Sequence, residues 1–157
     1  MKRSDFLKKI HKEGKLELVE PSQNISKSYI EKSNKSLKSA HILIKNNLYE
    51  DSVSKSYYAI YYCLLALLFR TGIKCENHTA SIIIFKELFD KNTSSKINPI
   101  KKTRINTDYS VENEPGSEET KRLYKEAENI ILDMKIILNN INETKINKIR
   151  EDFKKLI

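Results

Sequence analysis

The sequence predicts an all-α protein, an antiparallel bundle of four to five helices, and three observations support this class. The 157 residues include only 3 Gly and 3 Pro, too few turn-forming residues for a sandwich or barrel of many short strands. Charged residues make up 32% and hydrophobic residues 39%, a balance typical of folded helical proteins rather than disordered chains. Several segments also repeat apolar residues at the three- and four-residue spacing of amphipathic helices. At this length we expect one domain, residues 1–157.

The bounds of the elements follow from this periodicity and from the residues that stop helices. Helices are expected over residues 4–12, 24–46, 50–71, 78–91 and 118–141, with the bundle core at about 24–141 and an amphipathic tail at 142–157. The apolar segment Leu16–Val19 is expected to run extended into Pro21. The long helices should stop at Asn46-Asn47 and at Gly72, because both residue types adopt left-handed conformations that end a helix.

The second long helix is apolar almost all round from Tyr57 to Phe69. Such a helix must be covered on several sides, so it is expected at the centre of the bundle or against a partner subunit as well. Its 13 uncharged residues are well short of the ~20 that span a bilayer. With no apolar stretch of signal-peptide length after the basic N-terminal residues, we expect a cytoplasmic protein without a membrane segment.

Residues 92–116 show no convincing periodicity and are expected to form one long connection. A connection of this length in a compact domain is usually functional or disordered. Its charge is divided, since residues 91–104 hold five basic side chains and no acid, and residues 108–114 hold three acids and no base. The net charge of the chain, +8, favours an anionic partner such as nucleic acid.

The two cysteines, Cys63 and Cys75, are expected to be reduced thiols because two isolated cysteines do not make a disulfide framework. Cys75 and His78 have a spacing found among zinc ligands, but no second pair completes a tetrahedral site. We therefore expect no metal and no other cofactor.

The second long helix and the residues after it carry a recognisable pattern: Ser56-Tyr57-Tyr58-Ala59-Ile60-Tyr61-Tyr62, Leu64-Leu65-Ala66-Leu67-Leu68, Gly72-Ile73-Lys74 and His78. This pattern resembles the HEPN domain, named from higher eukaryotes and prokaryotes nucleotide-binding. The likeness is to its small prokaryotic branch, whose genes often neighbour a minimal nucleotidyltransferase. It extends from about Leu16 to Leu138 and includes Lys35-x-Leu37-x-x-Ala40 and the segment from Arg104 to Tyr109.

The resemblance implies a homodimer formed through the long helices and, as in many members, ribonuclease activity as a toxin or defence component. Active members carry an Arg, four to six further residues and then a His, and the two copies line one cleft. In this chain Arg104 is followed by four residues and then by Tyr109, so tyrosine stands where histidine is expected. A tyrosine with a pKa near 10 is a poor proton acceptor at neutral pH. Arg70 and His78 lie outside the family spacing and are expected in a different part of the bundle.

The candidate site residues each have a functional and a structural interpretation. Arg104, with Lys101 and Lys102, could bind RNA and stabilise charge on a phosphoryl group, or belong to a solvated basic loop. His78 could be a general base or a phosphate ligand, or it could cap the helix that begins there or bond a neighbouring backbone group. Tyr109 could replace the acid–base residue, or accept a nucleotidyl group from a partner transferase.

The tyrosine cluster has two interpretations as well. Tyr57, Tyr58, Tyr61 and Tyr62 form two pairs spaced by four residues, so that neighbouring rings share a helix face. The rings could stack on bases or a nucleotide, or fill a core or dimer seam. The sequence thus predicts an RNA-directed component of a two-gene toxin–antitoxin or defence module with a nucleotidyltransferase, either an active ribonuclease or a degenerate derivative. The alternative is a non-catalytic adaptor that binds a nucleotide or a protein.

Overall fold

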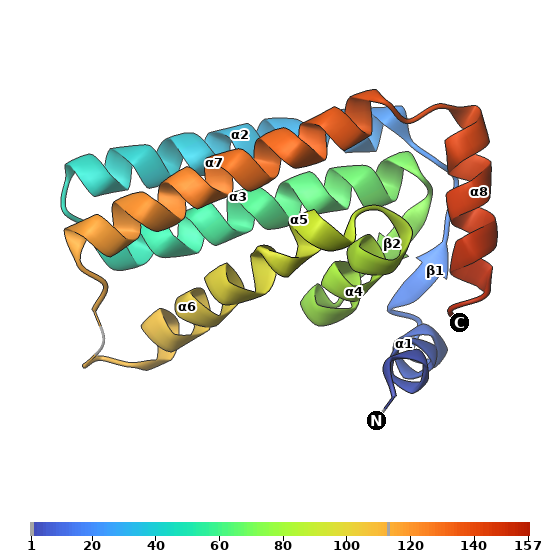
Figure 1. The fold of residues 1–157 in the computed structure, drawn as a ribbon, viewed down its shortest axis with the longest axis horizontal. Coiled ribbons are helices and arrows are strands. Elements are labelled where there is room, and N and C mark those ends of the chain that lie inside the picture. Colours follow the sequence, from blue (N-terminus) through green and yellow to red (C-terminus); the bar gives the residue numbers. More distant parts are fainter. Residues whose placement is uncertain (1, 113) are drawn as a thin grey trace.

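The computed structural model describes residues 2–112 and 114–157, and within them the chain is an all-α bundle, as the sequence predicts (Figure 1). The helices are α1 (Arg3–Lys12), α2 (Gln23–Lys45), α3 (Tyr49–Arg70), α4 (His78–Leu88), α5 (Lys91–Ser95), α6 (Ile97–Tyr109), α7 (Ser117–Asn139) and α8 (Glu143–Lys154). The strands are β1 (Leu16–Leu18) and β2 (Ile73–Cys75). None of the helices in these two ranges combines the length and apolar character needed to cross a bilayer.

Helix α3 is the central element, packed against α2, α6 and α7 (Figure 1). Within its apolar run only Tyr58, Tyr62 and Phe69 are partly exposed, and every other side chain is buried. This confirms the central position expected from an all-round apolar helix. The turn between α2 and α3 is sharp because Asn47 has a φ of 59°, the left-handed conformation expected at this stop.

Serine side chains allow α2 and α3 to approach closely without leaving polar groups unpaired. Ser33 Oγ donates to the carbonyl of Ala59 at 2.6 Å, and Ser52 Oγ donates to the carbonyl of Ala40 at 2.8 Å. Both serines are fully buried, so each hydroxyl needs such a partner. Small residues therefore set the spacing of the two helices.

The expectation of one long connection over residues 92–116 was wrong, because helices α5 and α6 occupy most of this segment. The Asp90 carboxylate accepts hydrogen bonds from two backbone N–H groups of α5, so α4 ends at Leu88 rather than at Lys91 and a new helix begins. Helix α6 buries only Ile97, Ile100 and Thr107, which is too few apolar positions to produce a visible stripe.

Strand β1 confirms the extended segment expected after α1, and it pairs antiparallel with β2. The pairing brings Leu18 opposite Ile73, next to the end of α3. Helix α8 closes this end of the bundle: Phe153 is fully buried, and the Arg150 guanidinium donates to the carbonyls of Val19, Thr71 and Gly72 at 2.8–3.2 Å.

Candidate active site

Arg104 lies on the inner side of α6, against two tyrosines of α3. Its guanidinium carbon is 4.9 Å from the ring centre of Tyr57 and 5.5 Å from that of Tyr58. Nη1 donates to the Asp108 carboxylate at 3.1 Å and to the Tyr58 hydroxyl at 3.4 Å. Only 17% of the side chain is exposed, and Nε is buried with no partner among the described residues. The ring faces of Tyr57 and Tyr58 thus hold the Arg104 guanidinium, whose Nε–H group remains without a hydrogen-bond partner among the described residues.

His78 is the first residue of α4, and its ring lies against the same tyrosines. Nδ1 is 2.8 Å from the Tyr57 hydroxyl, and the imidazole stacks on Tyr61 at 3.7 Å between ring centres, with 11° between the planes. The expectation that His78 caps its helix was wrong, because the Asn77 side chain accepts the hydrogen bond from the backbone N–H of Ala80. The imidazole of His78 is therefore not used to cap α4.

The tyrosines bring His78 and Arg104 into one cluster, although α4 and α6 contribute them separately. Tyr57 contacts both, through its hydroxyl on one side and its ring face on the other. The expectation that His78 belongs to a different part of the bundle from Arg104 was wrong. The two residues are 26 positions apart in the chain, so no short motif could reveal this pair.

Electrostatics keeps the imidazole neutral. Burial lowers the pKa of His78, and the positive charges of Arg104 and Lys101 lower it further. The pKa of Lys101 is itself lowered by burial and by Arg104, while its Nζ donates to the Thr79 hydroxyl at 2.7 Å. The cluster thus combines cationic donors with an uncharged imidazole at neutral pH, which suits an anionic ligand.

The buried tyrosines remain protonated phenols over the physiological range. Burial raises the pKa of Tyr57 well above its ordinary value and that of Tyr61 to about 12. The bond between Tyr57 and His78 then has two proton placements. If the Tyr57 hydroxyl donates to Nδ1, Nε2 carries a hydrogen; if Nδ1–H donates to Tyr57, Nε2 has a free lone pair that can accept a proton.

Tyr109 and Lys102 lie outside this cluster. Tyr109 ends α6 and is 85% exposed, and Lys102 is also exposed. Residues five apart on an α-helix differ in direction by about 140°, so Arg104 and Tyr109 point to different sides, whereas Asp108 shares the side of Arg104. The structure therefore joins Arg104, Lys101 and His78 and leaves Tyr109 and Lys102 apart.

Sequence reasoning missed the direct partners of these residues, Asp108 and the individual tyrosines. The tyrosine repeat on α3 was a visible signal, but which ring would meet which helix depends on the packing of α4 and α6. The i,i+4 pair of Arg104 and Asp108 becomes visible only once α6 is known to be a helix.

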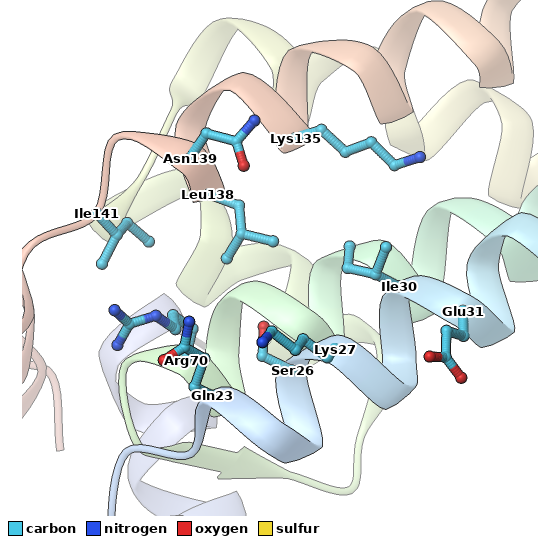
Figure 2. A pocket seen from close by; sticks show the side chains of 10 residues that line it. All are labelled: Gln23, Ser26, Lys27, Ile30, Glu31, Arg70, Lys135, Leu138, Asn139 and Ile141. Carbon is cyan, nitrogen blue, oxygen red and sulfur yellow. The ribbon is translucent and has the colours of Figure 1, made fainter.

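A pocket of about 570 Å³ lies at another part of the bundle, among the first turns of α2 and the ends of α3 and α7 (Figure 2). Arg70 and Lys27 line it together with apolar side chains that include Ile30 and Leu138. Arg70 is twelve residues, or about 18 Å, further along α3 than Tyr58. Arg70 thus belongs to a region separate from the Arg104 cluster. Among residues 2–112 and 114–157, no group of three or more His, Cys, Asp or Glu side chains could hold a metal ion.

The fold is a small helical bundle that brings Arg104, His78 and the tyrosines of α3 into one cluster. The family model of the HEPN domain matches residues 26–137, and the chain belongs to this family. Two relatives in Methanocaldococcus jannaschii are named "Putative toxin MJ0605" and "Putative toxin MJ0142". The first is 29% identical over 122 residues, 71% of this chain and 87% of that protein; the second is 29% identical over 120 residues, 76% and 80%. UPF0332 protein glr0978 of Gloeobacter violaceus is 36% identical over 56 residues, 36% of this chain and 44% of that protein.

Proposed function

We propose that this chain is the toxin component of a two-gene toxin–antitoxin or defence module and that it cleaves RNA, without a metal, at the cluster of Arg104, Lys101 and His78. The observation that carries the proposal is the juxtaposition of a partly buried guanidinium with a neutral imidazole, both held against the tyrosines of α3. The names of the two archaeal relatives support the toxin role.

The cluster supplies the groups that RNA cleavage requires. Arg104 and Lys101 bind the oxygens of the scissile phosphate and stabilise the charge that develops on them. His78 Nε2 accepts the proton of the ribose 2′-hydroxyl. The 2′-oxygen forms a bond to phosphorus while the bond from phosphorus to the 5′-oxygen breaks, and the leaving oxygen takes a proton from solvent. The products are a 2′,3′-cyclic phosphate and a free 5′-hydroxyl.

Tyr57 and Tyr61 act on this step by positioning the imidazole. The Tyr57 hydroxyl accepts from Nδ1–H in the tautomer that frees Nε2, and the Tyr61 ring fixes the plane of the imidazole by stacking. Because both phenols stay protonated, neither competes with His78 for the substrate proton. His78 rather than Tyr109 is therefore assigned the acid–base role.

Incubation of the purified protein with cellular RNA in EDTA tests the proposal. We expect cleavage by the wild type, a loss of about 10²–10³-fold in Arg104→Ala, and a loss of about 10²–10⁴-fold in His78→Ala. Arg122→Ala is the matched control, since Arg122 also forms an i,i+4 ion pair, with Glu126, but on the exposed face of α7. Equal RNA patterns in all four proteins would refute catalysis, and RNA binding without cleavage would favour the adaptor alternative.

A nucleotidyltransferase partner is the second part of the proposal, with Tyr109 as the acceptor of a nucleotidyl group. Its supporting observation is that Tyr109 is 85% exposed at the end of α6, where a second active site could reach it. Mass spectrometry after incubation with the transferase and ATP should find the added nucleotide on Tyr109 and none in Tyr109→Phe. An unmodified Tyr109 peptide would reject the assignment.

A homodimer is also part of the proposal, because the family resemblance places the sites of two copies in one cleft. The support in this chain is that apolar side chains remain exposed on the outer helices, Leu132 and Ile136 of α7 among them. Solution mass by light scattering should give twice the chain mass of 18.4 kDa. A monomer at cellular concentrations would reject it.

A further inference from the structure

We propose that a row of partly buried aromatic side chains beside the Arg104–His78 cluster is a stacking surface for the bases of single-stranded RNA. This inference rests on the function proposed above and names the form of RNA that the site takes. The row, called the aromatic strip, consists of Tyr58, Tyr62, Tyr29 and Phe69.

The members of the aromatic strip follow one another in contact. The ring centres of Tyr58 and Tyr62 are 6.0 Å apart, those of Tyr62 and Tyr29 are 6.3 Å apart, and those of Tyr29 and Phe69 are 5.4 Å apart. Three of the four lie along one side of α3, and α2 contributes Tyr29. All four are partly exposed, unlike the fully buried Tyr57, so a part of each side chain is accessible to a ligand.

Basic side chains accompany the rings. Lys32 holds its Nζ 4.6 Å from the ring centre of Tyr62, and Arg104 donates to the hydroxyl of Tyr58 at the end of the strip. Proteins that bind single strands combine cations that follow the phosphates with aromatic rings that stack on the bases. A phosphate held by Arg104 would thus place a neighbouring base at Tyr58 and the next at Tyr62.

Charge favours RNA over a second copy of the chain as the occupant of the strip. Face-to-face pairing of two copies along the strip would bring Lys32, whose Nζ lies over the Tyr62 ring, toward the same residue of the other copy, in a chain with a net charge of +8. Lysine side chains are depleted at the centres of protein–protein interfaces. A polyanion instead neutralises them.

The experiment compares Tyr62→Ala with Tyr62→Phe in a His78→Ala background, which removes the proposed acid–base group so that RNA stays intact. Binding is measured by fluorescence anisotropy with a fluorescein-labelled 12-nucleotide single-stranded RNA. We expect Tyr62→Ala to weaken binding about 5- to 140-fold, the range for one lost stacked base, and Tyr62→Phe to bind as the parent does. Tyr124→Ala is the control, because Tyr124 of α7 pairs with His41 at 5.5 Å in a comparable way but lies outside the strip.

The role of Lys32 gives an independent measurement. Lys32→Gln should reduce the slope of log affinity against log salt concentration by about 0.7, the value for one phosphate contact on a single strand. An unchanged slope would show that Lys32 does not contact a phosphate of the RNA. A duplex of the same length should bind more weakly than the single strand, because its bases are already stacked on one another.

The outcomes separate this inference from the proposed ribonuclease. Equal affinities of Tyr62→Ala and Tyr62→Phe would overturn the stacking role even if the wild type cleaves RNA. Tyr62-dependent binding in a protein that cleaves nothing would uphold the stacking role and reject catalysis. A change of oligomeric mass in Tyr62→Ala without a change in RNA affinity would show that the strip faces a second copy, and no RNA binding by the parent at low salt would overturn both ideas.

Discussion

Two glycines with the same backbone conformation allow a matched test of how α8 is fastened to the bundle. Gly14 and Gly72 both have a φ of +73°, which is strained for any residue with a Cβ. A Cβ at Gly14 would meet nothing within 4 Å. A Cβ at Gly72 would lie 2.1 Å from Arg150 Nη1, 2.4 Å from the Val19 carbonyl oxygen and 2.9 Å from the Pro21 nitrogen. Replacement by alanine thus imposes the same conformational strain twice but a steric conflict only once.

The size of the difference follows from these contacts. The left-handed conformation costs an alanine about 1–2 kcal/mol, and this applies to both Gly14→Ala and Gly72→Ala. At Gly72 the Arg150 side chain could rotate away, but it would lose its bonds to three carbonyls, and bonds of charged donors contribute about 1.5–3 kcal/mol each. The Val19 and Pro21 contacts are backbone atoms that cannot rotate. We expect Gly72→Ala to lower the free energy of unfolding by at least about 3 kcal/mol.

Thermal unfolding followed by circular dichroism measures both variants. For a chain of this length, 1 kcal/mol corresponds to roughly 2–4 °C. We expect Gly14→Ala to lower the Tm by about 2–8 °C and Gly72→Ala by at least about 6–12 °C. The smaller flexibility of alanine in the unfolded chain offsets part of each loss, and it cancels in the comparison. Equal losses in the two variants would show that Gly72 is not a close-packed junction and that Arg150 does not fasten α8 there.

Three further predictions concern the buried titratable groups. Because the folded pKa of His78 is below 6.5, the contribution of His78 to stability is fully present above pH 6.5 and is lost as the pH falls through the folded pKa. NMR titration should show that Arg104→Gln moves the pKa of His78 upward, and an unchanged pKa would refute the electrostatic coupling between the two residues. Tyr57→Phe keeps the ring but removes the partner of His78 Nδ1, so we expect a loss of about 1–3 kcal/mol in urea unfolding and slower RNA cleavage at unchanged RNA affinity. The Cys63 thiol is buried with a pKa of about 12, so a disulfide reagent should leave it unmodified in the native protein at pH 8 and label it after unfolding; rapid native labelling would contradict the burial.

The long helices could be predicted from the sequence because each carries its own evidence. The apolar period of α2 and the all-round apolar run of α3 are local patterns, and Asn47 and Gly72 mark helix ends through the conformations those residues tolerate. The structure places both residues just beyond their helices, with positive φ. Elements that depend on local chemistry were therefore predictable.

Helix α6 and the pairing of β1 with β2 could not be predicted, because neither leaves a local pattern. Helix α6 is mostly exposed and carries Pro99 in its first turn, a position that tolerates proline but that also resembles the start of a loop. The strands are three residues long, and β2 pairs with a segment nearly sixty residues earlier in the chain. Tertiary contact rather than propensity decides both elements.

The packing of His78 and Arg104 on the tyrosines of α3 limits what the sequence spacing between an Arg and an acid–base residue can predict. Two residues on one helix meet only at separations of three or four, so an Arg and an acid–base residue five apart on α6 would not share a face. In this chain the acid–base candidate instead comes from α4, and the buried Tyr57 and Tyr61 hold it beside Arg104. The geometry then depends on the packing of three helices rather than on one short segment. Substitutions at these tyrosines should therefore weaken the site even though we expect neither phenol to touch the reacting atoms.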